Sequence, residues 1–588
     1  MTIQTNGYEN IRFFCILFTM IDEKIKKYIK ETLMSVTVYI DKVDLEHPMD
    51  FKNGDYSTNV AMVYAKKTGE NPIEFAKKLA KGLIEHKPKE IEKIEVAGNG
   101  FINFYLSKDF FIDSVKEVLK KEENYGRNNF LKGQKTIVEY TDANPFKEFH
   151  IGHLMSNTIG ESISRIIDFC GAKVRRANYQ GDIGAHIAKA VWGIYQSKNN
   201  LPKEGLDAKD KAKFLGMAYA LGAKNYDADE NIKKEIEEIN KKIYSGEGGE
   251  IKKLYEWGRG ISLDYFETIY KRLGTKFDYY FFESKIAESA KKIVSEYLKK
   301  GLFEESEGAI IFKGEKYGLH TRVFQNSKGL PTYEAKELGL SKVKYEKYSY
   351  DKSLIVTGND INDYFDVLLK VMSFIFPKLA ERTVHIGHGM LKLPTGKMGS
   401  RTGEVITAEF LIDQVFKRVR PKMEESGLPE EIREEVAEKV SISALKYSIL
   451  KQKTGKDIIF DIDKSVSFDG DSGPYLQYTC VRAKSVIEKA KKQDKNPRAV
   501  SERKEITGIE KMIYRFPEII KRAGEEYSPH YLAIYLIELS SEFNTYYATN
   551  KIIGDSKETQ YRLAITKAVS IILENGLGIL GIKVPNRM

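Results

Sequence analysis

The feature of the sequence that most constrains its fold is a His-x-Gly-His pattern, formed by His150 and His153, between a predicted strand and a predicted helix. The apolar run 136–140 before it predicts a buried strand, and a helical period of isoleucines after it ends at Gly171. A helix N-terminus offers unpaired N–H groups and a dipole that favours phosphate. Two imidazoles there can donate hydrogen bonds to phosphate oxygens, and Gly152 leaves room for a flat base. The plainer alternative is a pair of turn histidines that bond only to backbone carbonyls.

A second candidate feature is the loop around Lys397, which reads LPTGKMGSRTGEVI and carries two cations among small residues. Such a loop can bring Lys397 onto a triphosphate and withdraw it after reaction. Alone it would usually be only a solvated turn, but beside the histidine pattern it indicates nucleotide chemistry. A second His-x-Gly-His match, at His385 and His388, ends a short apolar strand. We interpret it as a chance match that can still line the site.

The chain divides by pattern into four parts. Residues 1–19 form an N-terminal extension that we expect to contribute little, and Met20 is an alternative natural start. Residues 20–130 predict an α+β domain, with a helix beginning at Asn71-Pro72. Residues 131–407 alternate buried strands with helices, which predicts a doubly wound parallel sheet, with inserted surface helices at about 197–260. Residues 408–588 predict a helical domain.

Composition narrows the partners and the compartment. The chain has 94 Lys+Arg against 84 Asp+Glu, and a net charge of +10 permits a polyanionic partner such as nucleic acid. The three cysteines have no paired spacing, which excludes a disulfide framework and a cysteine-rich zinc site. No apolar run approaches the ~20 residues that span a membrane. The apolar stretch 13–21 lacks the flanks of a signal peptide, so we expect a cytoplasmic protein without a membrane partner.

Seven segments carry a resemblance to a known family, and two of them contain the histidine pattern and the Lys397 loop. They are IVEYTDANPFKEFHIGH, NYQGDIGAH, PTYEAKELGL, HGMLKLPTGKMGSRTGEV, GPYLQYTCVRA, and, near the N-terminus, NGDYSTNVAM and AGNGFINFYLS. They resemble class I aminoacyl-tRNA synthetases, and among these the arginyl-tRNA synthetases, over essentially the whole chain beyond Met20. The resemblance implies a multidomain α/β protein with a Rossmann-like catalytic domain, an α+β N-terminal tRNA-binding domain and an all-α anticodon-binding bundle. It implies an arginine–tRNA ligase, which activates L-arginine with ATP, releases pyrophosphate, and transfers arginine to the 3′ end of tRNA(Arg) to yield AMP.

The resemblance also implies which residues are catalytic. These are His150, His153, Lys147 and Lys397. Family members often lack the second lysine of the KMSKS loop, here Ser400, and carry a lysine ahead of the first histidine instead, here Lys147. Gly399 and Thr402 depart from the loop pattern. The residues expected to bind ATP are Gly152, His153, Met390, Lys397, Met398, Ser400 and Arg401.

A guanidinium requires carboxylate and amide oxygens in planar geometry. By resemblance, the arginine site consists of Glu139, Asn144, Glu283, Tyr333 and Glu337. Two positions depart from the family, since Glu337 stands where an aspartate is general and Ile361 where a glutamine is usual. We expect Asp360 or Asn362 to replace the glutamine, and the sequence does not choose between them.

The implied partners are tRNA(Arg), L-arginine and ATP with Mg²⁺ as its substrate complex, and we expect no prosthetic group, no structural metal, and a monomer. The expected tRNA contacts are Asn103 and Phe104 at the elbow, and Gln477, Tyr478, Arg482, Tyr547 and Met588 at the anticodon. Aromatic and arginine side chains on exposed helices suit stacking on splayed bases. The alternative is that the tyrosines belong to the core of the helical bundle.

Three other functions remain open from the sequence. Another class I synthetase would need a Cys/His zinc site or a bulky editing insertion, for which the chain has little room. A small-molecule adenylyltransferase shares the histidine pattern but does not explain the helical C-terminal third. A non-catalytic tRNA-binding paralogue is disfavoured by the intact histidines and lysines.

Overall fold

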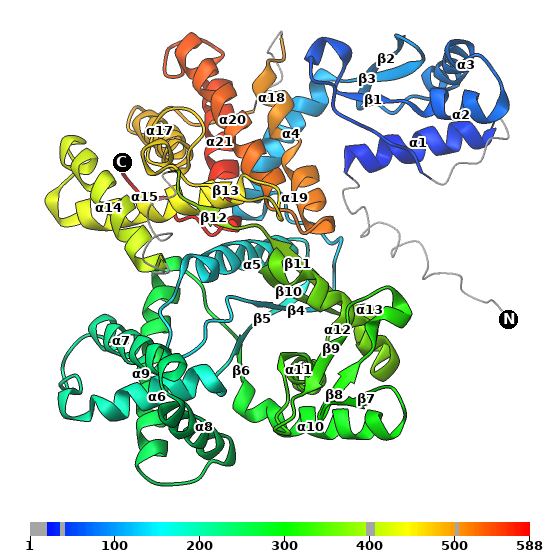
Figure 1. The fold of residues 1–588 in the computed structure, drawn as a ribbon. Coiled ribbons are helices and arrows are strands. Elements are labelled where there is room, and N and C mark those ends of the chain that lie inside the picture. The colour runs from blue at the N-terminus through cyan, green and yellow to red at the C-terminus, as the bar shows by residue number, and fades with distance from the viewer. Residues whose placement is uncertain (1–19, 36–41, 395–405, 500–504) are drawn as a thin grey trace, which may run out of the picture. The chain divides into compact units, whose positions relative to one another are not determined.

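The computed structural model describes residues 20–35, 42–394, 406–499 and 505–588 (Figure 1). The chain forms two compact units, each built from separate stretches of sequence. The first comprises Met1–Gly126, Arg482–Ile519 and Glu538–Asn575, and the second Arg127–Val481, Ile520–Ile537 and Gly576–Met588.

The first unit begins with a small α+β arrangement. Its antiparallel sheet has the order β1 (Tyr56–Thr58), β3 (Phe101–Leu106), β2 (Ile91–Ala97), and its helices are α1 (Ile21–Ser35), α2 (Val60–Thr68), α3 (Pro72–Glu85) and α4 (Lys108–Lys121). Asn71 caps α3 as its sequence predicts, because its Oδ1 accepts the Ile73 and Glu74 N–H groups at 2.9 and 3.2 Å. The remainder of the unit is helical and includes α18 (Gly508–Ile513) and α20 (His530–Thr549) in part.

A five-stranded parallel sheet forms the centre of the second unit. Its order is β11 (Thr383–His388), β10 (Lys352–Gly358), β4 (Lys135–Tyr140), β5 (Lys173–Gln180), β6 (Tyr279–Phe282). The chain proceeds from β4 outward to β5 and β6, then returns to β10 on the other side of β4. This confirms the doubly wound sheet, and the reversal beside β4 is where such folds bind ligands at the carboxyl ends of the strands.

Helices cover both faces of this sheet because side chains alternate along β4. Tyr140 faces α5 (Ile151–Phe169), which approaches so closely that a Cβ on Gly160 would lie 2.4 Å from the Tyr140 Cβ. Ile137 and Glu139 face the opposite side, where Ile137 joins a core shared with α10 (Glu283–Lys299), α11 (Tyr333–Lys347) and α12 (Asn362–Ile375). A three-stranded antiparallel sheet, β7 (Glu304–Ser306), β8 (Ala309–Phe312) and β9 (Arg322–Gln325), precedes α11.

The polar stretch after β5 folds into helices that have a core of their own. They are α7 (Ala208–Ala228), α8 (Glu230–Ser245) and α9 (Glu250–Leu273), and they pack on α6 (Ala185–Gln196). Trp192, Leu215 and Ile236 are among the buried residues of that core. The insertion is therefore a packed subdomain, and it also contributes side chains near the sheet edge.

The C-terminal third is helical as predicted. Its longer helices are α14 (Ala408–Glu425), α15 (Glu430–Leu450), α17 (Gly473–Lys491), α20, and α21 (Thr559–Ile579). A short parallel pair, β12 (Leu391–Lys392) with β13 (Ile458–Ile459), lies in the second unit. No helix in the described part of the chain is both long and apolar enough to span a bilayer.

Candidate functional site

The histidine pattern forms the first turn of α5. His150 is the N-cap residue, and its Nδ1 accepts the Gly152 N–H at 3.1 Å, while His153 Nδ1 accepts the His150 N–H at 3.2 Å. A neutral imidazole that accepts at Nδ1 carries its proton on Nε2. Burial, and then Lys147, lowers the pKa of His150 to about 4, and burial also lowers the pKa of His153 strongly. At neutral pH both rings are therefore uncharged Nε2–H donors.

Gly152 also makes room for the ring of His150. A Cβ at this position would lie 2.9 Å from the His150 Cε1, because the His150 ring folds back over the first turn of the helix. The sequence assigned the glycine to the approach of a base, and the structure adds this local steric reason.

Lys147 lies in the turn before α5, half-buried. Its Nζ is 5.2 Å from the centre of the Tyr219 ring on α7, and burial, then Lys189, lowers its pKa. Its charge also acts on His186 at the start of α6, whose Nε2 lies 3.1 Å from the Gly181 carbonyl oxygen. His186 was not singled out by sequence reasoning, although it stands in the NYQGDIGAH segment.

The remaining expected ATP contacts are only partly placed. Lys397, Met398, Ser400 and Arg401 lie outside the described residues. Met390 lies just before β12 with its side chain half-exposed, and its backbone N–H donates to Asp457 Oδ1 at 2.9 Å.

Four buried or half-buried carboxyl groups gather around the carboxyl end of β4. We call them the acid cluster: Glu139 on β4, Asp142 in the following turn, Glu283 at the start of α10, and Glu337 on α11. Glu139 pairs with Lys344 at 2.8 Å, each side chain only 1% exposed, and Glu283 pairs with Lys336. Burial, with Glu139 next, raises the pKa of Glu337 to about 8. Burial likewise raises the pKa of Asp142.

Sequence reasoning selected three of these four acids and missed Asp142 and both lysines. Asp142 adopts a left-handed backbone conformation (φ 51°), and its Oδ1 accepts the Tyr179 N–H at 2.9 Å. Aspartate tolerates this conformation better than most residues, which is a signal the TDAN turn carries.

Asn144 and Tyr333 flank the acid cluster differently. Asn144 Oδ1 accepts the Gly181 N–H at 2.8 Å, so the side chain is fixed against the end of β5. Tyr333 begins α11 with 58% of its surface exposed, and Lys336 Nζ lies 4.5 Å from its ring centre. The expected arginine-binding residues thus come together at the carboxyl ends of the central strands, with Tyr333 on the solvent side.

Asp182 joins these parts. It is fully buried, its Oδ1 accepts the Ser284 N–H at 2.8 Å, and its Oδ2 accepts the Ser284 hydroxyl at 2.8 Å and Arg259 Nε at 3.0 Å. Its neighbour Gly181 holds Asn144, and Ser284 is adjacent to Glu283. The adjacent residues Gly181 and Asp182 therefore hold Asn144 on one side of the acid cluster and Ser284, next to Glu283, on the other.

Ile361 stands at the position where a glutamine is usual in the family, and the residue near it that faces the acid cluster is neither Asp360 nor Asn362. Ile361 packs against the core, and Asn362 is directed toward β11, since a Cβ on Gly387 would lie 2.4 Å from its Oδ1. Tyr364 on α12 faces the acids instead: burial raises its pKa, and Glu337 is the next cause.

His385 and His388 have local partners. His385 Nε2 lies 2.7 Å from the Thr357 hydroxyl and its ring stacks on Phe365 at 3.8 Å. His388 Nδ1 lies 2.7 Å from the Gly389 carbonyl oxygen. The interpretation of this match as a chance one stays a prediction, because His150 and His153 also have local partners.

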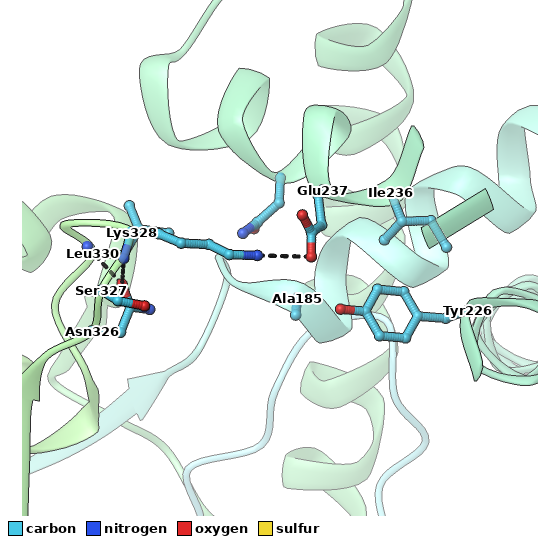
Figure 2. A pocket seen from close by; sticks show the side chains of 9 residues that line it. Ala185, Tyr226, Ile236, Glu237, Asn326, Ser327, Lys328 and Leu330 are labelled. Atoms are coloured by element: carbon cyan, nitrogen blue, oxygen red, sulfur yellow. Dashed lines mark hydrogen bonds and ion pairs between the residues drawn. The ribbon is translucent and has the colours of Figure 1, made fainter. Parts of the chain in front are cut away.

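The inserted helices reach the carboxyl edge of the sheet and also border a pocket. Burial, then Glu283 and then Tyr333, raises the pKa of Tyr244 on α8, so this helix lies near the acid cluster. A pocket of about 320 Å³ is lined by Ala185, Tyr226, Ile236, Glu237, Asn240 and the loop 326–330 (Figure 2). Lys328 Nζ contacts Glu237 Oε1 at 2.7 Å, which joins α8 to the loop leading into α11.

The expected tRNA contacts differ in exposure. Phe104 is fully buried in the core of the small α+β arrangement, and Asn103 Oδ1 accepts the Ser57 hydroxyl at 2.7 Å. Gln477 is also buried and donates to the Lys583 carbonyl at 2.7 Å. The other expected residues, half-buried or exposed, are Tyr478, Arg482, Tyr547 and Met588. Arg482 Nη1 donates to Asn544 Oδ1 at 2.8 Å and its guanidinium lies over Tyr547.

Among the described residues, no group of three or more His, Cys, Asp or Glu side chains is arranged to hold a metal ion.

Known proteins resemble this chain over most of its length. An arginine–tRNA ligase from Halothermothrix orenii is 31% identical over 497 residues, which cover 83% of this chain and 86% of that protein. One from Treponema denticola is 29% identical and covers 94% of this chain and 97% of that protein. The solved arginyl-tRNA synthetase of Thermus thermophilus shares the fold with a TM-score of 0.79 at 23% identity, covering 97% of this chain and 100% of that one.

Three family models match successive parts of the chain. The arginyl tRNA synthetase N-terminal domain matches residues 21–106, the class I (R) tRNA synthetase catalytic domain residues 114–462, and the DALR anticodon binding domain residues 476–588. With the doubly wound sheet and the histidine turn at its reversal point, they define a class I aminoacyl-tRNA synthetase. The domains flanking the catalytic one narrow the assignment further. The chain belongs to the arginyl-tRNA synthetase family.

Proposed function

We propose that this chain is an arginine–tRNA ligase that forms arginyl-adenylate from L-arginine and ATP and transfers arginine to the 3′ end of tRNA(Arg). The observation that carries the proposal is the turn after β4. It follows Glu139 on β4, contains Asp142 of the acid cluster, and ends at the His150–His153 donors of α5. A cation selector and a phosphate-binding helix end thus share one edge of the sheet.

In the first step, the arginine carboxylate attacks the α-phosphate of ATP in line and pyrophosphate leaves. No protein nucleophile is needed, so catalysis rests on positioning and on charge. The Nε2–H groups of His150 and His153 donate to oxygens of the pentacoordinate phosphate, and Lys147 supplies positive charge beside them. We expect Lys397 to act on the phosphates as well, and Mg²⁺ enters with ATP as its substrate complex.

In the second step, a hydroxyl of the tRNA 3′-terminal ribose attacks the carbonyl of arginyl-adenylate and AMP leaves. We expect tRNA to be required already for the first step, as the family resemblance implies. Pyrophosphate exchange measured with and without tRNA decides this point.

The acid cluster selects the amino acid. A carboxyl pair satisfies the planar guanidinium, whereas the lysine side chain offers a single ammonium and leaves buried acceptors unpaired, at about 1–3 kcal/mol each. Tyr333 and Asn144 complete the site from its outer rim and from the β5 side.

We assign tRNA binding to the first unit and to the helical C-terminal residues. Arg482 and Tyr547, which stack on each other, are the contacts best supported by exposure. Asn103, Phe104 and Gln477 can reach tRNA only through their backbones or after rearrangement, since their side chains are buried. Because several Lys and Arg side chains must displace counterions, affinity should fall steeply between low and moderate salt.

The test of the proposal is a charging assay with total tRNA and each of the twenty amino acids. We expect ATP-dependent attachment of arginine alone. Attachment of a different amino acid would identify another class I synthetase, and tRNA binding without any charging would identify a non-catalytic paralogue. We propose a monomer in the cytoplasm, which sedimentation and fractionation can check.

A further inference from the structure

The charges of the acid cluster do not balance. It contains four carboxyl groups, and α11 brings two lysines to it, Lys336 and Lys344. Each lysine is already paired, Lys336 with Glu283 and Lys344 with Glu139. Two carboxyl groups, Asp142 and Glu337, are left without an ion pair among the described residues.

Among the residues with described positions, Glu337 also lacks a hydrogen-bond donor at one of its two carboxyl oxygens. Its Oε2 is fully buried and, in the described part of the chain, accepts no hydrogen bond. Taking a carboxylate out of water without a cation or a donor is costly, so a buried group of this kind takes up a proton instead.

Asp142 is better supported, and burial, then Glu139 and Glu337, raise its pKa. One of its oxygens accepts the Tyr179 N–H. Glu139, Glu337 and Lys344 are the charged groups that face it, two of them acidic. Two neighbouring carboxyl groups that share one environment resist being ionised together.

No other neighbour within the described ranges supplies the missing positive charge. Around Glu337, the charged groups that act on it are Glu139 from β4, Glu283 from α10, and Lys336 and Lys344 from its own helix. From β5 and α12 the phenols of Tyr179 and Tyr364 face it, and both are neutral because burial raises their pKa. Among the residues that the structure describes, the lysines that act on Glu337 are the two that are already paired.

From this arrangement we infer that, before arginine binds, the acid cluster carries one extra proton on Glu337 or Asp142, and that binding of arginine expels it. The inference rests on the proposed function and adds Asp142 as a residue that determines specificity. On binding, that carboxylic O–H breaks and its proton goes to solvent. The two carboxylates then accept hydrogen bonds from the cationic groups of arginine. A guanidinium remains protonated at every working pH, so it cannot take up the proton itself.

The inference has a consequence for selectivity. Citrulline has the shape of arginine but a neutral side chain, so it has no charge with which to displace the proton. Arginine should bind more tightly as the pH rises toward about 8, by up to tenfold per pH unit, and citrulline should not follow.

The experiment is isothermal titration calorimetry of the full chain with L-arginine. Titrations at pH 7.0 in phosphate, HEPES and Tris, which differ in ionisation enthalpy, give the number of protons exchanged. We expect release of about one proton at pH 7.0 and close to none at pH 9. Arginine binding with no proton release at pH 7.0 would overturn the inference and leave the proposed function standing. Absence of arginine binding together with absence of charging would overturn both.

Two variants and a control locate the proton. Glu337→Gln and Asp142→Asn, which keep shape and remove the ionisable group, should each reduce proton release to below about a third of the wild-type value. Glu161→Gln removes another buried acid, which pairs with Arg165 and Arg176 on the α5 side of the sheet, and should leave the release unchanged. Should a variant fail to fold, the wild-type count at pH 7.0 and 9 still decides the matter. Unchanged release in both site variants would overturn the assignment.

Discussion

The rings of His150 and His153 stack at 3.6 Å between centroids, and each Nδ1 accepts a backbone N–H of the same helical turn. The two residues therefore cap α5 with one side of their rings and present Nε2–H with the other. This arrangement fixes the tautomer, which decides whether a histidine can donate to phosphate. A pattern that reads as a binding motif is at the same time a helix cap.

A substitution can separate these two roles, the helix cap and the Nε2–H donor. His150→Asn keeps a capping oxygen and removes the Nε2–H donor. We expect the rate of adenylate formation to fall by about 10²–10³, the usual effect of losing one preorganised donor, with thermal stability nearly unchanged. Single-turnover kinetics in the presence of tRNA measure the rate. His385→Asn, in the second His-x-Gly-His match, is the control and should lower the rate far less; an equal loss would show that both matches act in catalysis.

The two lysines expected at the phosphates should act on rate and not on amino acid affinity. Lys147→Met and Lys397→Ala each remove a positive charge that is useful chiefly when negative charge develops on the phosphates. We expect kcat for pyrophosphate exchange to fall by at least tenfold in each variant, with the Kd of arginine within about twofold of the wild-type value. A normal rate of adenylate formation in Lys397→Ala would remove that residue from the mechanism.

How much of this site the sequence could predict depends on how far apart along the chain the residues in contact lie. The strand, the turn and the capped helix from residue 135 to 169 are local, because apolar periodicity and the turn residues act within a few positions. The pairing of Lys344 with Glu139 joins residues 205 positions apart and depends on the rotation of α11 against β4. No periodicity specifies that rotation, so the sequence does not indicate the role of Lys344, nor that of Lys336, although Lys336 stands in the PTYEAKELGL segment.

Residues 103 and 104 illustrate a second limit. Strand β3 is buried on both faces over Ile102, Asn103 and Phe104, so the alternation that marks an exposed face is absent. Resemblance to the family suggested a tRNA contact there, whereas the structure uses both side chains internally. Gln477 is similar: its buried amide holds the Lys583 carbonyl, a contact over 106 positions.

Asp182 should control arginine binding through its neighbours. Asp182→Asn weakens the hold on Ser284 and on Arg259, and so loosens Glu283 beside the site. We expect KM for arginine to rise by about 10–100-fold while KM for ATP changes by less than threefold. Glu161→Gln, which also breaks buried pairs with arginines, should lower stability without this split. If both variants change the two KM values equally, the role of Asp182 is only structural.

Lys446 makes the stability of the second unit depend on pH. Its Nζ donates to the carbonyls of Leu273 and Gly581 at 2.6 and 2.8 Å, and burial, then Arg165, lowers its pKa to about 7. Because the pKa in the unfolded chain is about 10.4, the unfolded state binds more protons between the two values, and this group adds stability as pH rises from 7 to about 10. Below pH 7 the lysine is protonated in both states, and its contribution no longer changes.

Lys446→Met keeps much of the side-chain volume and removes both the proton and the two hydrogen bonds. At pH 9 we expect a loss of about 1–3 kcal/mol in the free energy of unfolding, because two buried carbonyls lose their donor, and a smaller loss at pH 7, where the wild-type chain still bears the cost of deprotonating the buried lysine. Between pH 7 and 9 the wild-type chain should gain stability relative to the variant, since only the wild-type chain has the titrating group. Urea unfolding of both proteins at pH 6, 7, 8 and 9 measures the difference. A difference that stays constant from pH 7 to 9 would show that Lys446 is fully charged in the folded protein, and the two carbonyls would then hold an ammonium ion throughout.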